Sequence, residues 1–428
     1  MPLPSWRRYP AGLDFISYDR PPSGVTPEIV PLSAPDGGKS RGVLYRRGSE
    51  STVVCIMHPR ADMTRHYLAP HLIDGGYAFF AQESRWPGSD VATIHEMLVA
   101  DVAAGLMFLK ARGFENVVLL GNSGAASLYC LYQSQAVTSP PDRLKDTAAG
   151  DPYDINKFDM PPAQGMIFLG AHLGPGKILM TEIDPSVVHE RDPLSCNPDL
   201  DMFNPRNGFR EPPEESAFSE QFVHRYRAAQ IERVSRIDGI ARDLIARQRA
   251  FLRLSEQSFV ANSTFDQRTA IIRSGAQGHY LQISRLEANP AFVDLSIQPS
   301  ARSYGALMST RPDISNFGEA AVKILTPRAW LSSWSGHSSR ASVVDSLPKV
   351  DVPTLVLNYS GDSAIHPYHS RTIYENSPAS DKTKAEVNGD HFGLDPVTRT
   401  DKGARAEAAG IMIEWLQRRF PSRNRTTG

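Results

Sequence analysis

Three residues that could together perform nucleophilic catalysis stand in the order serine, aspartate, histidine along this 428-residue chain. Ser123 interrupts the run VVLLGNSGAAS, Asp362 lies in SGDSAIHP, and His391 lies in VNGDHFGL. A serine hydroxyl is a weak nucleophile near neutral pH, and a histidine, with an ordinary pKa of about 6.5, can remove its proton. An aspartate behind the imidazole fixes its tautomer and stabilises the imidazolium that forms. These residue types predict that Ser123 attacks, His391 acts as base and then acid, and Asp362 orients His391.

The serine stands where the chain must turn sharply. The apolar run before it, residues 117–120, is typical of a buried strand, and the small residues after it are typical of the start of a helix. At such a turn a serine is either the N-cap of the helix or a nucleophile, and this string alone does not decide. The nucleophile hypothesis gives a reason for Gly121 and Ala125, because bulk there would collide with the neighbouring strand or helix.

Strand-like and helix-like segments alternate around these motifs, which predicts an α/β fold with a mostly parallel central sheet flanked by helices. An edge hairpin is predicted from residues 27–35 and 41–46. Loops at the carboxyl ends of parallel strands gather at one edge of the sheet, where Ser123 and Asp362 would meet. The predicted buried strands are 52–59, 77–85, 117–120, 164–174 and 353–359, and the main predicted helices are 91–112 and 401–419.

A long segment without this alternation separates the two sets of strands. Residues 175–348 are rich in charge and follow a helical period over part of their length. We therefore expect a helical insertion between two parts of one core, residues 1–174 and 349–428. The acidic residues of its main helix are interpreted as a solvated face: Glu232, Asp238 and Asp243.

The motifs, in this order, resemble the α/β-hydrolase family. The matching features are a strand, the Gly-Asn-Ser-Gly-Ala elbow and a helix, a large insert, and then Gly-Asp-Ser-Ala-Ile-His-Pro and Gly-Asp-His-Phe-Gly after the strands resume. The resemblance covers residues 27–174 and 350–420 and implies that the insert is a helical lid. One small departure is Ala125, where the family usually has glycine.

The resemblance implies a serine hydrolase that cleaves a carboxylic ester or lactone through an acyl-enzyme. Ser123, Asp362 and His391 would be its triad, and Asp390 is the less favoured acid because adjacent side chains rarely converge. One alternative is hydrolysis of a carbon–carbon bond in a ketone or diketone with the same triad. Another is a protein that binds a ligand without turnover. No cofactor and no metal are implied, because the triad and water suffice.

The resemblance also implies two backbone N–H groups that form an oxyanion hole. Gly124, directly after the nucleophile, would supply one. The loop after strand 52–59 would supply the other, at the position of Arg60, with Ala61 as the nearest alternative. Pro59 has no N–H group, so it cannot donate.

Several residues near predicted strand ends are candidates for binding the substrate. His58 and His172 could contact it, although hydrogen bonding within their loops is the favoured role. In the insert, Trp330 and Trp334 could line an apolar pocket or form the core of the insert. The mixture of aromatic and arginine residues predicts a small-molecule substrate that is bulky, partly apolar and polar or acidic at one end.

Composition excludes several classes of protein. The net charge of -1, with 41% hydrophobic and 22% charged residues, favours a globular protein that binds neither nucleic acid nor an anionic membrane surface. No apolar run is long enough for a membrane span, and the N-terminus lacks a signal-type apolar stretch, so a cytoplasmic location is expected. The three cysteines have no metal-type spacing, which favours packing roles. A homodimer is a further expectation, because lids of this size often contribute dimer contacts in the resembling family.

Overall fold

The central sheet joins segments from both parts of the chain. The computed structural model describes residues 7–8, 16–420 and 422. Within them, the main sheet has the strand order β1-β2-β4-β3-β5-β6-β11-β12. Neighbours from β4 to β12 pair in parallel, and β1 and β2 form the antiparallel edge hairpin that the sequence predicts. The bounds are β1 Glu28–Ser33, β2 Lys39–Tyr45, β3 Thr52–Met57, β4 Ala78–Gln82, β5 Asn116–Asn122, β6 Gly165–Leu169, β11 Thr354–Tyr359 and β12 Lys382–Val387.

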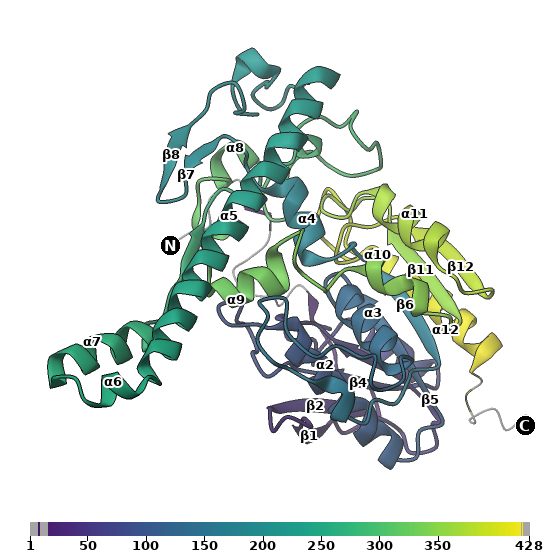
Figure 1. The fold of residues 1–428 in the computed structure, drawn as a ribbon. Coiled ribbons are helices and arrows are strands. Elements are labelled where there is room, and N and C mark those ends of the chain that lie inside the picture. Colours follow the sequence, from purple (N-terminus) through teal and green to yellow (C-terminus); the bar gives the residue numbers. More distant parts are fainter. Residues whose placement is uncertain (1–6, 9–15, 421, 423–428) are drawn as a thin grey trace, which may run out of the picture.

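Helices cover both faces of this sheet, as expected from the alternating pattern (Figure 1). Successive side chains of a strand point to opposite faces. Cys55 and Leu119 accordingly pack in the layer that contains α2 and α3, whereas Val54 and Val118 pack in the layer that contains α1 and α12. The bounds of the helices around the sheet are α1 Ala69–Asp74, α2 His95–Ala111, α3 Ala125–Ala136, α11 Pro367–Asn376 and α12 Ala404–Arg419.

Residues 175–348, which we call the insert, lie between β6 and β11 and are dominated by one long helix (Figure 1). Ser219 caps that helix, α5, by accepting the N–H of Phe222. The end of α5 projects from the body together with α6 and α7, and we call residues 250–276 the arm. The insert contains α4 Pro175–Glu182, β7 Val187–His189, β8 Asp192–Cys196, α5 Glu220–Ser255, α6 Ser258–Ala261, α7 Phe265–Ala276, β9 Leu281–Ile283, α8 Pro312–Ser315, β10 Lys323–Leu325, α9 Pro327–Ala329 and α10 Val343–Ser346.

The insert is not purely helical, which corrects the expectation from sequence. Two antiparallel strand pairs, β7 with β8 and β9 with β10, lie within it. Strands of three to five residues are too short for a period of two to stand out in the sequence. None of the described helices, α5 included, is both long and apolar enough to cross a membrane.

The acidic face predicted for α5 is only partly solvated. Glu232 and Asp243 are exposed, but Asp238 is buried, so its interpretation as a solvated residue is wrong. The Asp238 carboxylate accepts hydrogen bonds from Nε1 of Trp330 (2.7 Å) and from the hydroxyls of Ser335 and Ser338 (2.8 Å each). Asp238 therefore holds the segment after α9 against α5.

Candidate active site

Ser123 occupies a strained turn between β5 and α3. Its φ is 52°, in the left-handed region that non-glycine residues rarely adopt. The turn is held because the Ser123 N–H donates to the carbonyl of Leu169 on β6 at 3.0 Å. The chain is also tightly packed here, since a Cβ atom on Gly121 would lie 2.8 Å from Cα of Ala126. This geometry lifts the serine hydroxyl out of the sheet at its carboxyl edge.

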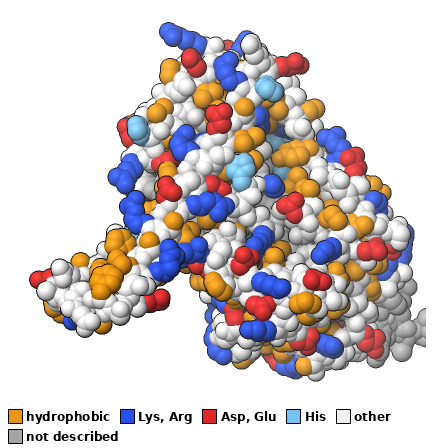
Figure 2. Space-filling model, in the orientation of Figure 1, with side chains coloured by type: hydrophobic (Ala, Val, Ile, Leu, Met, Phe, Trp, Pro, Cys, Tyr) orange, Lys and Arg blue, Asp and Glu red, His pale blue; other side chains and the backbone are white. Residues whose placement is uncertain are grey.

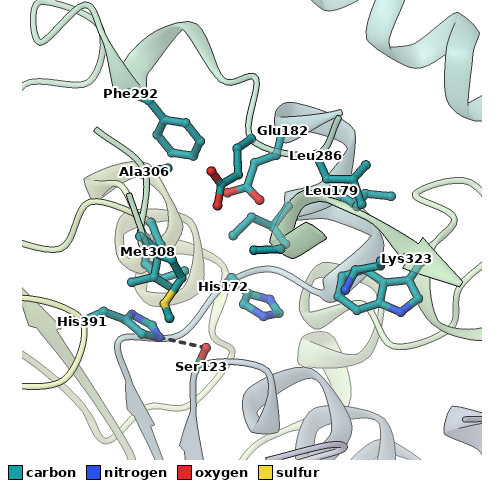
Figure 3. A pocket seen from close by; sticks show the side chains of 17 residues that line it. Ser123, His172, Leu179, Glu182, Leu286, Phe292, Ala306, Met308, Lys323 and His391 are labelled. Carbon is teal, nitrogen blue, oxygen red and sulfur yellow. Dashed lines mark hydrogen bonds between the residues drawn. The ribbon is translucent and has the colours of Figure 1, made fainter. Parts of the chain in front are cut away.

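His391 bridges Ser123 and Asp362. Its Nε2 atom lies 3.1 Å from Oγ of Ser123 (Figure 3). Its Nδ1 atom lies 2.6 Å from Oδ2 of Asp362. The other carboxylate oxygen of Asp362 accepts the backbone N–H groups of Ala364 (2.8 Å) and Ile365 (2.9 Å). The fold thus brings the three residues of the predicted triad into hydrogen-bond contact.

The electrostatics of His391 suit a general base. Burial lowers the pKa of the ring, but the charge and hydrogen bond of Asp362, with the charge of Asp390, outweigh it and raise the pKa above its usual range. A carboxylate at Nδ1 favours the tautomer with the proton on Nδ1, which leaves Nε2 free to accept the serine proton.

Asp390, the alternative acid, serves its own loop. Its Oδ1 atom accepts the backbone N–H groups of Phe392 and Leu394, both at 2.9 Å. Its Oδ2 atom forms an ion pair with Arg399 at 3.0 Å. These bonds fix the turn that carries His391, whereas the bond to the imidazole comes from Asp362.

The two predicted oxyanion donors differ in their surroundings. The Gly124 N–H has no hydrogen-bond partner within the described residues. The Arg60 N–H is directed at Nδ1 of His58 (3.2 Å), and so is the N–H of Ala61, the alternative donor (2.8 Å). The Arg60 side chain pairs with Asp90 at 3.0 Å. The Gly124 N–H is therefore available to a ligand, whereas the Arg60 N–H is hydrogen-bonded to the imidazole of His58.

A cavity of about 280 Å³ opens above the triad (Figure 3). Ser123 and His391 lie on its floor together with His172, and side chains of the insert form its walls. Trp334 is among the residues that line the cavity, and its contact with substrate stays a prediction. Trp330 does not line the cavity, because its side chain is fully buried in the insert and bonded to Asp238. The prediction of Trp330 as a substrate-binding residue is therefore corrected to a role in the core of the insert.

Three charged residues of the insert also line the cavity, and the sequence analysis missed them. They are Glu182, Glu287 and Lys323. Burial and the neighbouring charge of Glu287 raise the pKa of Glu182 to about 8. Nζ of Lys323 lies 3.1 Å from Asp90 and over the ring of Trp334. No sequence motif surrounds these residues, so no signal marked them.

Possible metal ligands and the thiol of Cys55 were the other candidates for chemistry in the core. The part of the chain that the structure describes contains no group of three or more histidine, cysteine, aspartate and glutamate side chains that could hold a metal ion. Cys55 is packed in the core, and burial raises the pKa of its thiol to about 12, which disfavours a thiolate.

The sheet order, the elbow after β5 and the positions of Asp362 and His391 after later strands define the α/β-hydrolase fold, which confirms the predicted fold class. The sequence matches no family model and no curated protein. Among solved structures it is similar to the esterase domain of a Rhodothermus marinus protein (9% identity, 92% of this chain and 98% of that one, TM-score 0.41). It is also similar to DcsB in complex with its substrate analogue (12%, 92% and 99%, 0.46) and to a thermophilic esterase from Thermogutta terrifontis (12%, 91% and 98%, 0.39). Similarities at this level carry no weight for the choice of substrate.

Proposed function

We propose that this protein is a serine hydrolase that cleaves a carboxylic ester or lactone through an acyl-enzyme. The observation that carries the proposal is the position of His391, within 3.1 Å of the Ser123 hydroxyl and 2.6 Å of the Asp362 carboxylate. A helix N-cap would require none of this arrangement, and the strained φ of Ser123 supports a nucleophile elbow. The side chain of Ser123 does not cap α3, because the N-cap residue of this helix is Gly124.

The geometry supports a two-stage reaction. Oγ of Ser123 attacks the carbonyl carbon while its proton passes to Nε2 of His391, and Asp362 stabilises the resulting imidazolium. His391 then returns the proton to the leaving alcohol, which gives an acyl group on Ser123. A water molecule, activated by the same imidazole, releases the acid. In this proposal the Gly124 N–H donates a hydrogen bond to the charged oxygen of each tetrahedral intermediate.

The cavity supports a substrate of modest size that is largely apolar. Leu179, Leu286, Phe292 and Met308 line its walls, which fits the expected apolar part. The wall with Glu182 and Glu287 supports a neutral polar group, because burial raises the pKa of both acids and a protonated carboxyl both donates and accepts hydrogen bonds. Arg60 offers no free counter-charge, since it is paired with Asp90.

The insert is proposed to act as a lid over the core formed by residues 1–174 and 349–428. Its support is the cavity itself, in which α4 and residues near Lys323 and Trp334 stand opposite Ser123 and His391. Such a cover excludes water and selects substrates by shape.

The homodimer and the cytoplasmic location stay predictions. The arm supports pairing of two copies, because several of its apolar side chains are exposed on a segment that projects from the body (Figure 2). These are Leu252, Phe259, Phe265 and Ile272. Light scattering of the wild type and Phe265→Glu would show a dimer and its dissociation, and a monomeric wild type would contradict the pairing.

A graded series of p-nitrophenyl esters and simple lactones tests the hydrolase proposal. We expect turnover that is lost in Ser123→Ala, with short to medium acyl chains preferred because the cavity is small. Separation of the products distinguishes ester cleavage from cleavage of a diketone, since only the former releases an alcohol and an acid. A folded wild type that turns over neither class, and binds compounds unchanged, would contradict the proposal.

A further inference from the structure

Two histidine rings converge on Gly124, the residue after the proposed nucleophile. A Cβ atom on Gly124 would lie 2.9 Å from Nε2 of His58 and 3.4 Å from Nε2 of His172. His58 follows β3 and His172 follows β6, and these strands are the two neighbours of β5 in the sheet. The rings therefore flank the elbow from both sides, and glycine at position 124 leaves them room.

Hydrogen bonds at Nδ1 determine where each ring carries its proton. Nδ1 of His58 accepts the N–H groups of Arg60 and Ala61, and Nδ1 of His172 accepts the N–H of Gly174 at 3.0 Å. A nitrogen that accepts a hydrogen bond cannot carry the proton of a neutral imidazole. We therefore assign the proton of both rings to Nε2, which makes both Nε2 groups donors next to Gly124.

Both rings stay uncharged in this environment. Burial and the nearby charge of Arg60, with other histidines, hold the pKa of His58 well below its usual range. Burial and Arg60 lower the pKa of His172 to about 3. A neutral imidazole donates through Nε2 without exchanging a proton with the substrate, so it can stabilise charge while His391 alone transfers protons.

Neither Nε2 group has a hydrogen-bond partner among the described residues, although the His58 and His172 side chains are only 9% and 5% exposed. His172 lies beside Ser123 on the cavity floor (Figure 3). The His172 ring lines the cavity, so the acceptor that its Nε2–H group lacks can come from a bound ligand. The Gly124 N–H likewise has no hydrogen-bond partner among the described residues.

We propose that the Nε2–H groups of His58 and His172 complete the oxyanion hole together with the Gly124 N–H. This proposal rests on the proposed hydrolase function. When Oγ of Ser123 bonds to the carbonyl carbon, its proton moves to His391 and the carbonyl π electrons move onto the oxygen. That oxygen accepts the donors' hydrogen bonds, and they weaken when the C=O bond reforms and the alcohol leaves.

An oxyanion-hole role for His58 also explains why the backbone of the loop after β3 is hydrogen-bonded to its ring. The backbone N–H groups of Arg60 and Ala61 hold the ring of His58 instead of pointing at the substrate. The ring then presents its own N–H on the opposite side. In this proposal the His58 side chain, which the loop orients, donates the hydrogen bond that was expected from the backbone of the loop.

Variants of His172 test the proposal, because His58 also holds its loop. His172→Leu removes the donor, His172→Phe removes it but keeps a ring, and His172→Gln restores an amide N–H. We expect the Leu and Phe variants to lower kcat for a p-nitrophenyl ester about 10²-fold or more with little change in KM. His172→Gln should recover part of the loss.

His369→Gln is the matched control, because its amide oxygen can still accept the N–H of Leu173. His369 is also buried, and its Nδ1 atom accepts the N–H of Leu173 at 3.4 Å, but it does not line the cavity. Its variant should keep the kcat of the wild type. Circular dichroism and a thermal melt identify the folded variants, and His172→Phe carries the test if the Leu variant does not fold.

A trifluoromethyl ketone gives a second readout, because its adduct with Ser123 bears the charged oxygen. Its affinity should fall in parallel with kcat in the variants that lack the donor. Wild-type kcat and wild-type ketone affinity in a folded His172→Phe would overturn the proposal. A wild type that neither hydrolyses esters nor binds the ketone would instead contradict the hydrolase function, so the two failures are distinguishable.

Discussion

His391 and Asp362 lie 29 positions apart in the chain, yet Nδ1 of the histidine and Oδ2 of the aspartate are 2.6 Å apart, and both residues are buried. Asp362 follows β11, and His391 follows β12, the parallel neighbour of β11. The sheet itself therefore makes the contact. The same contact sets the pH at which His391 can act as a base.

The Asp362 carboxylate outweighs burial and raises the pKa of His391. As the pH is lowered, activity should therefore be lost at a higher pH than a free imidazole would give. Protonated His391 cannot accept the serine proton, so kcat/KM should rise with pH through a midpoint above about 6.5. Asp362→Asn removes the charge, so this midpoint should move to lower pH and kcat should fall by about 10³-fold or more. Asp390→Asn is the control and should keep most of kcat. Equal losses in both variants would contradict the assignment of the acid.

The raised pKa of Glu182 predicts a second pH effect, on stability. The folded protein keeps the Glu182 proton up to a pH of about 8, whereas the unfolded chain releases it in the ordinary carboxyl range. Stability should therefore fall as pH rises between these values. Glu182→Gln removes the effect, so its Tm relative to the wild type should increase from acidic to mildly alkaline pH. A constant Tm difference would show that Glu182 is already ionised in the folded protein.

The elbow should not tolerate a methyl group at Gly121. The added Cβ atom would lie 2.8 Å from a backbone atom of Ala126, which cannot move without displacing α3. Gly121→Ala should cost about 1–3 kcal/mol of unfolding free energy and slow the reaction of Ser123. Gly410→Ala, in α12 with open space around it, should be neutral or stabilising. Denaturant unfolding of both variants measures the contrast, and similar values would refute the close approach.

Two acidic residues of α5 should differ sharply although they look alike in the sequence. Asp238→Ala would leave the buried Nε1 of Trp330 and two serine hydroxyls without an acceptor, at a cost of about 2–4 kcal/mol. Asp243→Ala, on the exposed face, should change stability by less than about 0.5 kcal/mol. Thermal unfolding of the two variants measures this, and a neutral Asp238→Ala would contradict the buried network.

The sequence predicted the core well because its signals are local. The buried strands are short apolar runs, and Ser123, Asp362 and His391 each lie within a few residues of the end of a strand, so their meeting follows from the parallel sheet. Asp238 could not be placed because its partner Trp330 lies 92 positions away and only the packing of the insert joins them. The pairing of His58 with the Arg60 N–H was equally hidden, since it depends on the rotation of one ring. Glu182 and Lys323 line the cavity only because the insert folds over the core, and no local sequence pattern marks that contact.

Intact mass after incubation with a fluorophosphonate tests the identity of the nucleophile most directly. Wild type, Ser123→Ala and His391→Ala are compared, with each variant shown to be folded. We predict a single adduct on the wild type, no adduct on Ser123→Ala and strongly slowed labelling of His391→Ala. An adduct that persists in Ser123→Ala, or a wild type that stays unlabelled even by a smaller phosphonate, would contradict the account.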